Sequence, residues 1–252
     1  MSGRTVDYGL DSPAIVRGQL ALAVAAILLA VLKPRIFGLN LRWLALAAGA
    51  YFLYGALSMI EYSRWGKLRL RERLLDLIAW RGDESVLDVG CGKGLVLVGA
   101  AHRLTTGRAV GVDRWLPHAM TGNEPEGALR NAATEGVQDR VELLKGDIRS
   151  LPVQAEAFDV VLSNFVVHEV DTAAEREALL REMLRVLKPG GRLALVDFIF
   201  TKECVDVLRR SGASDATRLR IGGLRHWLGA IFMLGAFQLC AVIATKDAAP
   251  LL

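Results

Sequence analysis

The stretch VLDVGCGKG, residues 86–94, decides the fold. A short apolar run predicts a buried strand that brings Asp88 near its carboxyl end, and the glycines then predict a tight turn that opens a helix. Glycine permits the unusual backbone dihedrals of such a turn and lets a ligand approach the main chain. A dinucleotide-binding fingerprint would need glycine at position 95, where this chain has leucine, so the pattern is GxGxG preceded by an acidic residue.

Outward from this loop, strand-like and helix-like segments alternate. Repeated βα units of this spacing predict a mostly parallel sheet that is covered by helices on both faces. The expected strands are 85–90, 108–113, 140–146, 158–164 and 192–200, and the expected helices between them are 93–104, 124–135 and 172–187.

Polar residues follow several of these strands. Asp113 ends the second strand about 20 residues after the glycine loop, where a carboxylate usually meets ribose hydroxyls. Asp147 and Ile148 follow the third strand, and Asn164 ends the fourth. The segment LKPGG, 187–191, then predicts a turn from the helix into the fifth strand.

The motifs VLDVGCGKG, GVD, GDI, FDVVLSN and LKPGG, in this order and spacing, resemble those of class I S-adenosylmethionine-dependent methyltransferases. The resemblance covers about residues 65–220, with an extension to 246, and is greatest to the small-molecule group that includes quinone C-methyltransferases. It implies an α/β fold with a Rossmann-like, seven-stranded, mostly parallel sheet, and S-adenosyl-L-methionine as the cofactor.

The resemblance also implies roles for individual residues. Asp88 and the loop would bind the methionine part of the cofactor, Asp113 the ribose, Asp147 the adenine amino group, and Ile148 the adenine ring. Asn164 would also face the methionine end. Asp88 could instead only brace the loop, Asp147 could be a turn residue, and Asn164 a strand-end cap. The full set of expected cofactor-binding residues is Asp88, Gly90, Cys91, Gly92, Gly94, Asp113, Arg114, Trp115, Asp147, Ile148 and Asn164.

Two further residues are candidates for catalysis. Methyl transfer to a sulfonium-activated methyl group depends largely on positioning, and a base is needed only if the nucleophile must lose a proton. His168 and Glu169 lie just after the fourth strand, where this fold opens toward its acceptor. His168 would serve as that base near neutral pH, or would only hydrogen-bond the loop. Trp115 would either cover the ribose or fill the core.

Composition narrows the class of protein. Cys91, Cys204 and Cys240 are scattered without a CxxC pair or a nearby histidine, so we expect neither disulfides nor a metal site. The formal charge of +4 is modest. SNFVVH follows the fourth strand in place of an NPPY-type motif, which argues against a nucleic-acid substrate.

The hydrophobic fraction of 52% is high for a soluble protein, and the excess lies near the N-terminus. Residues 18–32 and 43–60 are two apolar runs, and a membrane-spanning helix needs about 17–25 residues. We expect a membrane helical hairpin within residues 1–61 that spans the bilayer or dips into it. The alternatives are a cleaved signal peptide and a buried hairpin of a soluble domain.

In residues 62–82, leucines are interspersed with basic residues, a pattern that predicts an amphipathic connecting helix. This helix could lie on the membrane or pack on the domain that follows, residues 83–252. More basic residues follow the second apolar run than lie in the loop between the two runs, which favours a cytoplasmic catalytic domain on the cell inner membrane.

A third apolar run, 225–246, is long enough to span a membrane. The resemblance, however, requires a final antiparallel strand beside the fifth, and 238–246 is the remaining segment that can supply it, paired with a strand at 217–223. We therefore expect a buried strand there. The preceding segment, 227–237, would dip into the membrane surface, wall the acceptor pocket or pack in the core.

The sequence thus predicts a membrane-anchored methyltransferase that acts on a lipophilic small molecule such as a quinone, isoprenoid, sterol or phospholipid. The alternative is a non-catalytic S-adenosylmethionine-binding module that assembles or regulates a membrane complex. The oligomeric state is left open.

Overall fold

The computed structural model describes residues 5–32, 35–36, 39–116, 121–221 and 239–248. The chain forms two compact units. One consists of Gly9–Lys67 with Pro117–Gly122, and the other of Met1–Tyr8, Leu68–Leu116 and Asn123–Leu252. The boundary differs from the expected one, because the residues before Gly9 belong to the larger unit.

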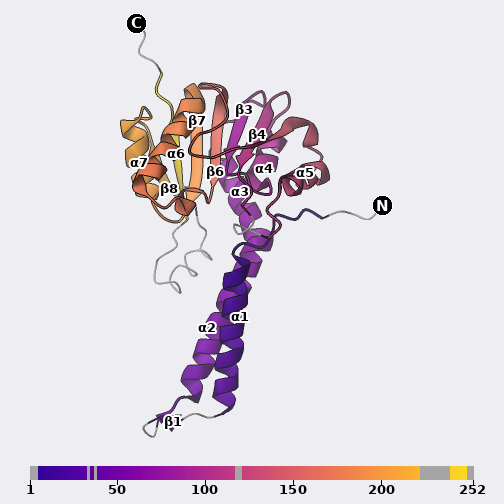
Figure 1. Cartoon of the computed structure of the whole chain (residues 1–252), viewed down its shortest axis with the longest axis vertical. Coiled ribbons are helices and arrows are strands. Elements are labelled where there is room, and N and C mark those ends of the chain that lie inside the picture. Colours follow the sequence, from indigo (N-terminus) through magenta and orange to yellow (C-terminus); the bar gives the residue numbers. More distant parts are fainter. Residues whose placement is uncertain (1–4, 33–34, 37–38, 117–120, 222–238, 249–252) are drawn as a thin grey trace. The chain divides into compact units, whose positions relative to one another are not determined.

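The larger unit is built on a seven-stranded sheet of order β5-β4-β3-β6-β7-β9-β8 (Figure 1). β3 to β7 run parallel, and β9 lies antiparallel between β7 and β8. The strands are β3 (Ser85–Val89), β4 (Arg108–Asp113), β5 (Val141–Lys145), β6 (Phe158–Asn164), β7 (Leu187–Asp197), β8 (Thr217–Arg220) and β9 (Cys240–Thr245). The predicted seven-stranded, mostly parallel sheet is confirmed, and so is the buried final strand beside the fifth.

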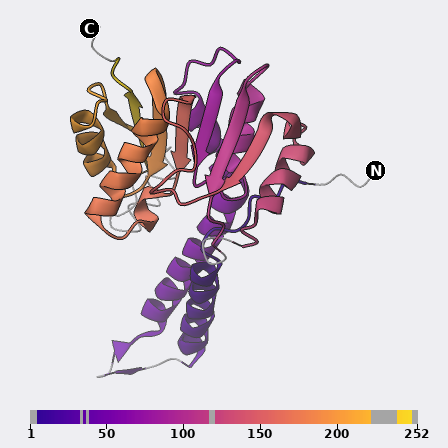
Figure 2. The same cartoon turned by 45° about the horizontal axis from the view of Figure 1, so that its top comes forward.

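The central strands are apolar because both of their faces are covered. Leu87 of β3 is fully buried and lies in register with Val110 of β4 and Val161 of β6. Helices pack on both faces of the sheet (Figures 1 and 2). They are α3 (Lys67–Leu75), α4 (Leu95–Arg103), α5 (Pro125–Thr134), α6 (Ala173–Val186) and α7 (Thr201–Arg210), with short 3₁₀ turns at η2 (Gln138–Arg140) and η3 (Val167–Glu169).

β7 begins and ends earlier than predicted. LKPGG, expected as a turn, is the start of the strand, because Gly190 N–H donates to the Lys246 carbonyl and Lys246 N–H donates to the Gly191 carbonyl. The strand ends at Asp197, and Phe200, with φ of 58°, caps α7. The early end places Asp197 at the carboxyl edge of the sheet.

The smaller unit is a helical hairpin of α1 (Pro13–Val31) and α2 (Arg42–Glu61), with the two-residue strands β1 (Arg35–Ile36) and β2 (Leu39–Asn40) between them. Small residues lie where the two helices meet. A Cβ atom at Gly49 would come within 2.9 Å of Ile27 Cγ1 and 3.4 Å of the Ala23 carbonyl oxygen, so glycine permits this close packing.

The predicted connecting helix is shorter than expected. A π-helical turn, η1 (Tyr62–Gly66), follows α2, and α3 ends at Leu75 instead of continuing to residue 82. Leu74 and Leu75 are fully buried, and a Cβ atom at Gly99 of α4 would lie 2.8 Å from Leu75 Cδ1. Of the two alternatives for this helix, the structure shows the second, because α3 packs on the domain that follows it.

Candidate cofactor and acceptor site

The expected site residues follow four strands that are neighbours in the sheet. β5, β4, β3 and β6 stand side by side and run parallel, so the residues at their carboxyl ends share one edge. The chain order reverses between β3 and β6. A switch point of this kind opens a ligand crevice at the carboxyl ends of the strands.

The glycine loop is fixed by hydrogen bonds to its neighbour. The N–H groups of Gly90 and Cys91 both donate to the Val112 carbonyl at the end of β4, at 2.8 and 3.3 Å. Gly90 has φ of +74°, and a Cβ atom there would lie 2.3 Å from Val166 Cγ2. Glycine is therefore required at position 90 both for its dihedral and for space. Gly94, with φ of +81°, caps α4 at the end of the loop.

Cys91 contributes packing beneath the loop. Its Sγ would lie 2.7 Å from a Cβ atom on Gly111, so the thiol fills the space that glycine leaves in β4. Burial raises the pKa of the Cys91 thiol well above its usual value, with smaller contributions from the charges of Asp88 and Asp113. The thiol is thus neutral and inert, and the main chain of this residue is the part available to a ligand.

Asp88 is a buried carboxyl at the end of β3. It is 1% exposed, and burial raises its pKa to about 7. Its Oδ1 has no hydrogen-bond partner among the described residues. A ligand ammonium group would supply the missing partner and counter-charge, so this position fits the methionine end of S-adenosylmethionine.

Asp113 and Trp115 brace the loop from β4. The Asp113 carboxylate accepts the N–H of Gly92 at 2.8 Å and of Trp115 at 2.6 Å, and the Trp115 indole N–H donates to the Gly92 carbonyl at 2.9 Å. Trp115 is only 9% exposed, which favours the packing alternative over a ribose cover. The remaining lone pairs of Asp113 can accept hydroxyl groups.

Asp147 is held in its charged form. Hydrogen bonds from Arg149, both side chain and backbone, lower the pKa of Asp147 to about 2. The side-chain bond is 2.7 Å, and Arg114 lies 3.9 Å from the same carboxylate. The backbone bond also makes Asp147 a turn residue, as one alternative expected. Ile148 packs against the hydrophobic core.

The end of β6 leads into the predicted catalytic segment. Asn164 lies in register with Val196 of β7. Phe165 follows with φ of +57°, and its N–H donates to the Val196 carbonyl. This left-handed residue turns the chain into η3, where His168 and Glu169 lie.

His168 is paired with Asp197, a residue outside the predicted site. Its Nδ1 lies 3.2 Å from the carboxylate of Asp197, which also accepts the His168 backbone N–H at 3.1 Å. Asp197 is fully buried at the end of β7, and the His168 side chain is 24% exposed. The imidazole contacts two aromatic rings that also contact each other, with its centroid 4.5 Å from that of Phe198 and 6.2 Å from that of Phe165.

Glu169 does not share this arrangement. It is exposed, and its N–H donates to the Val166 carbonyl in the 3₁₀ turn. A catalytic role for Glu169 therefore stays a prediction. The rule that led to Asp113 and Asn164, a polar residue at the carboxyl end of a parallel strand, would also have found Asp197. The overlong prediction for the fifth strand hid it.

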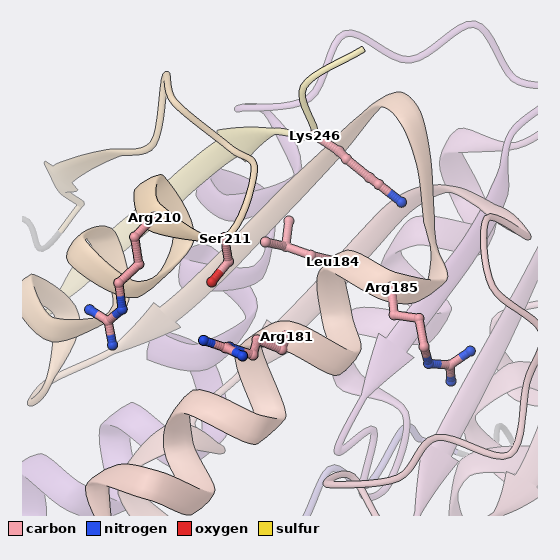
Figure 3. Close-up of a pocket in the computed structure, with 6 residues that line it drawn as sticks. All are labelled: Arg181, Leu184, Arg185, Arg210, Ser211 and Lys246. Atoms are coloured by element: carbon pink, nitrogen blue, oxygen red, sulfur yellow. The ribbon is translucent and has the colours of Figure 1, made fainter. Parts of the chain in front are cut away.

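A pocket of about 430 Å³ lies elsewhere (Figure 3). It is lined by residues of α6, α7 and the segment after β9, and none of the expected site residues is among them. Its basic groups already have acidic partners, such as Glu177 for both Arg181 and Arg210. Figure 3 shows the guanidinium groups of Arg185 and Arg210 directed away from each other. The lining residues are Arg181, Leu184, Arg185, Arg210, Ser211 and Lys246.

The strand order, the glycine loop at the switch point and the carboxylates at the carboxyl ends of β3, β4 and β5 together define a Rossmann-like nucleoside-binding fold of the class I type. Residues 87–195 match the family model described as a methyltransferase domain. A protein of Encephalitozoon cuniculi that bears a methyltransferase name is 36% identical over 184 residues, which are 70% of this chain and 75% of that protein. The chain belongs to the family of S-adenosylmethionine-dependent methyltransferases.

Other relatives match a smaller share of their own length. The 27-O-demethylrifamycin SV methyltransferase of Amycolatopsis mediterranei is 34% identical over 60% of this chain and 50% of its own length. The chain spans about half the length of this relative and of the methyltransferase GfsG of Streptomyces halstedii, where the share is 46%.

Solved structures share the fold. The geranyl diphosphate C-methyltransferase of Streptomyces coelicolor, in complex with Mg²⁺, geranyl diphosphate and S-adenosyl-L-homocysteine, aligns with a TM-score of 0.56 and 19% identity over 79% of this chain and 84% of that one. The [4+2]-cyclase SpnF aligns with a TM-score of 0.54 and 21% identity over 72% of this chain and 82% of that one. One fold thus carries different reactions, and the reaction must be argued from the site.

Proposed function

We propose that this protein transfers a methyl group from S-adenosylmethionine to a lipophilic, membrane-associated small molecule. The observation that carries the proposal is the pair formed by His168, in the 3₁₀ turn after β6, and Asp197, at the end of β7. This pair lies beside the strand ends where the cofactor residues gather. A proton acceptor at this place suits an acceptor molecule whose nucleophile must be deprotonated.

The cofactor would be held by the residues described above. Asp88 would bind the ammonium group, Asp113 the ribose hydroxyls and Asp147 the adenine amino group, while the main chain of the glycine loop lies against the methionine part. When bound, S-adenosylmethionine supplies a methyl group activated by the adjacent sulfonium. The work of the protein is then positioning, exclusion of water and removal of a proton.

His168 would take that proton. With Nδ1–H donated to Asp197, its Nε2 is the nitrogen that can accept the proton of an acceptor O–H or acidic C–H. Loss of the proton would make the acceptor atom nucleophilic toward the methyl group that S-adenosylmethionine would supply, and the proton would remain on His168 Nε2 until it passes to solvent. Asp197, buried and fixed by the Phe198 N–H, stabilises the protonated ring.

Two observations support a lipophilic acceptor. Phe165 and Phe198 lie next to each other and to His168, and would give the acceptor an apolar, aromatic surface. The geranyl diphosphate C-methyltransferase that shares this fold is solved in complex with geranyl diphosphate, an isoprenoid. Quinone, isoprenoid, sterol and phospholipid-like molecules all fit this description.

The helical hairpin supports a membrane location. α1 and the helix Arg42–Leu75 contain 18-residue windows with mean hydropathies of 2.2 and 1.6, and only 17% of each window is buried. A core hairpin of a soluble protein would bury such residues, whereas Leu28 is 61% exposed and Leu44 is 67% exposed. Insertion in the cell inner membrane, with a cytoplasmic catalytic domain, would cover these side chains.

Mass spectrometry of lipids tests the proposal. Membrane extracts from cells with and without the protein should differ by a lipid that has gained the mass of one CH₂ group, and purified protein should bind S-adenosylmethionine saturably. Saturable binding without any methylated lipid would favour the alternative, a non-catalytic cofactor-binding module. Absence of binding would contradict both.

A further inference from the structure

The fourth residue of the glycine loop run GCGKG is a buried lysine. Lys93 is 5% exposed, and its ammonium lies 2.6 Å from Asp7 Oδ2. These residues are 86 positions apart in the chain. The segment before the first apolar helix therefore reaches the cofactor loop, and Met1–Tyr8 belongs to the same compact unit as the sheet.

The Asn131 side chain of α5 holds the two partners in place. Its carbonyl oxygen accepts the Asp7 N–H at 2.9 Å, while its amide donates to the Asp7 carbonyl at 3.0 Å and to the Lys93 carbonyl at 2.9 Å. Asn131 is 3% exposed. The loop backbone at Lys93, the α5 amide and the N-terminal segment are thus joined in one hydrogen-bonded ring.

Tyr8 fastens the segment at a second point. It is 6% exposed, and its hydroxyl donates to the Glu135 carboxylate, which also accepts from His102 at 2.9 Å and lies 3.4 Å from Arg71. Burial and the bond to Glu135 raise the pKa of Tyr8 above its usual value, so the hydroxyl stays protonated and donates. The segment is therefore held at Asp7 and at Tyr8.

The ion pair between Lys93 and Asp7 affects the loop that would bind the cofactor. Lys93 lies between Gly92 and Gly94, so its main chain belongs to the loop against which a cationic sulfonium cofactor would lie. Asp7 compensates the Lys93 charge, and its own side chain is 76% exposed. Without Asp7, a buried ammonium loses this partner, and the loop must shift to return it to water.

We propose that Asp7 is a positioning residue for the cofactor site, acting through Lys93 to hold the glycine loop in its binding conformation. The N-terminal segment is then part of the cofactor-binding machinery as well as the lead into the hairpin. This inference rests on the proposed function, because it concerns the same cofactor site.

Calorimetric titration of the full chain in detergent with S-adenosylmethionine tests it. Asp7→Asn should raise the Kd by about fivefold, as expected for the loss of about 1 kcal/mol from a half-buried ion pair. Asp7→Glu should restore most of the affinity. Asp83→Asn is the matched control, because Asp83 is 63% exposed, pairs with Arg81 at 3.1 Å and precedes β3 at the end opposite to the loop.

A double-mutant cycle separates the proposed path from a general loss of stability. In a Lys93→Met background, Asp7→Asn should leave the Kd unchanged, and the melting temperature of Asp7→Asn should stay within about 4 °C of the unmodified chain. The inference is overturned if Asp7→Asn leaves the Kd within twofold of that of the unmodified chain. It is also overturned if Asp7→Asn raises the Kd by the same factor in the Lys93→Met background as in the unmodified chain. If the unmodified chain does not bind the cofactor, the proposed function itself fails.

Discussion

The Asp197 carboxylate contacts His168 twice, through the imidazole Nδ1 at 3.2 Å and through the backbone N–H at 3.1 Å. One buried acid at the end of β7 therefore fixes both the position of the 3₁₀ turn after β6 and the orientation of the ring that it carries. The acceptor side of the site therefore depends on residues from two neighbouring strands, β6 and β7.

His168→Ala should lower kcat by roughly 100-fold, the usual contribution of a general base, and leave the Kd for S-adenosylmethionine within about twofold. Asp197→Asn should lower kcat by a smaller factor, because the ring remains but its orientation and charge stabilisation are weakened. Single-turnover methyl transfer together with calorimetry separates the two quantities. A His168→Ala variant with unchanged kcat would exclude the base.

Asp88→Asn should change both stability and affinity. The folded-state pKa of about 7 lies above the ordinary value of 3.8, so the unfolded chain ionises first and stability declines as pH rises from about 4 through 7. The variant should lack this decline and be more stable than the unmodified chain at pH 8 when no cofactor is bound.

The same variant should bind S-adenosylmethionine roughly tenfold more weakly or worse, because the ammonium group loses a charged acceptor. Urea unfolding across pH 4 to 8 and calorimetry measure the two effects. Asp83→Asn, which removes an exposed carboxylate, is the control. If Asp88→Asn retains full affinity, Asp88 only braces the loop.

Gly90→Ala should be more damaging than Gly136→Ala. Both glycines have positive φ, +74° and +73°, so both substitutions incur backbone strain of about 1–2 kcal/mol. Only the Cβ atom at position 90 would also meet Val166, whereas position 136 has open space. Urea unfolding should therefore show a larger loss for Gly90→Ala, and the loss that Gly90→Ala causes should be smaller in a Val166→Ala background than in the unmodified chain. Equal losses would mean that Val166 does not limit the loop.

Leu22→Lys should reduce retention of the protein in membranes. Leu22 is 50% exposed at the middle of α1, and a lysine near the centre of a spanning helix costs about 2.5–3.5 kcal/mol. Leu129→Lys is the matched control, since Leu129 is 46% exposed on α5 of the other unit. Carbonate-washed membranes measure retention. Equal behaviour of the two variants, with both proteins in the soluble fraction, would contradict the membrane hairpin.

Much of the fold was predictable because its signals are local. Alternating apolar strands and helices gave the parallel sheet, and the need for a last strand placed β9 in the sheet instead of in a membrane. The end of α3 at Leu75 and the early start of β7 were not predictable in the same way. Both depend on tertiary contacts, such as the hydrogen bonds between Gly190 and Gly191 of β7 and Lys246.

The residues of the candidate site also fall into those with a local sequence signal and those that depend on tertiary contacts. Asp88, Gly90, Asp113 and Asp147 follow strands directly and were visible in the sequence pattern. The pairing of Asp197 with His168 joins residues 29 positions apart, and that of Asp7 with Lys93 joins residues 86 apart. Pairings of this kind have no periodic signature in a single sequence. The apolar segment 227–237, expected at the membrane surface, the acceptor pocket or the core, lies outside the described residues, and its role stays a prediction.

Methyl transfer into lipid tests the central claim most directly. The full chain in membranes, supplied with S-adenosylmethionine labelled in its methyl group, should incorporate label into lipids that are recovered in the organic phase of an extract. The His168→Ala chain should incorporate roughly 100-fold less label per unit time. Saturable cofactor binding by the unmodified chain, with no label in any lipid fraction, would contradict the account.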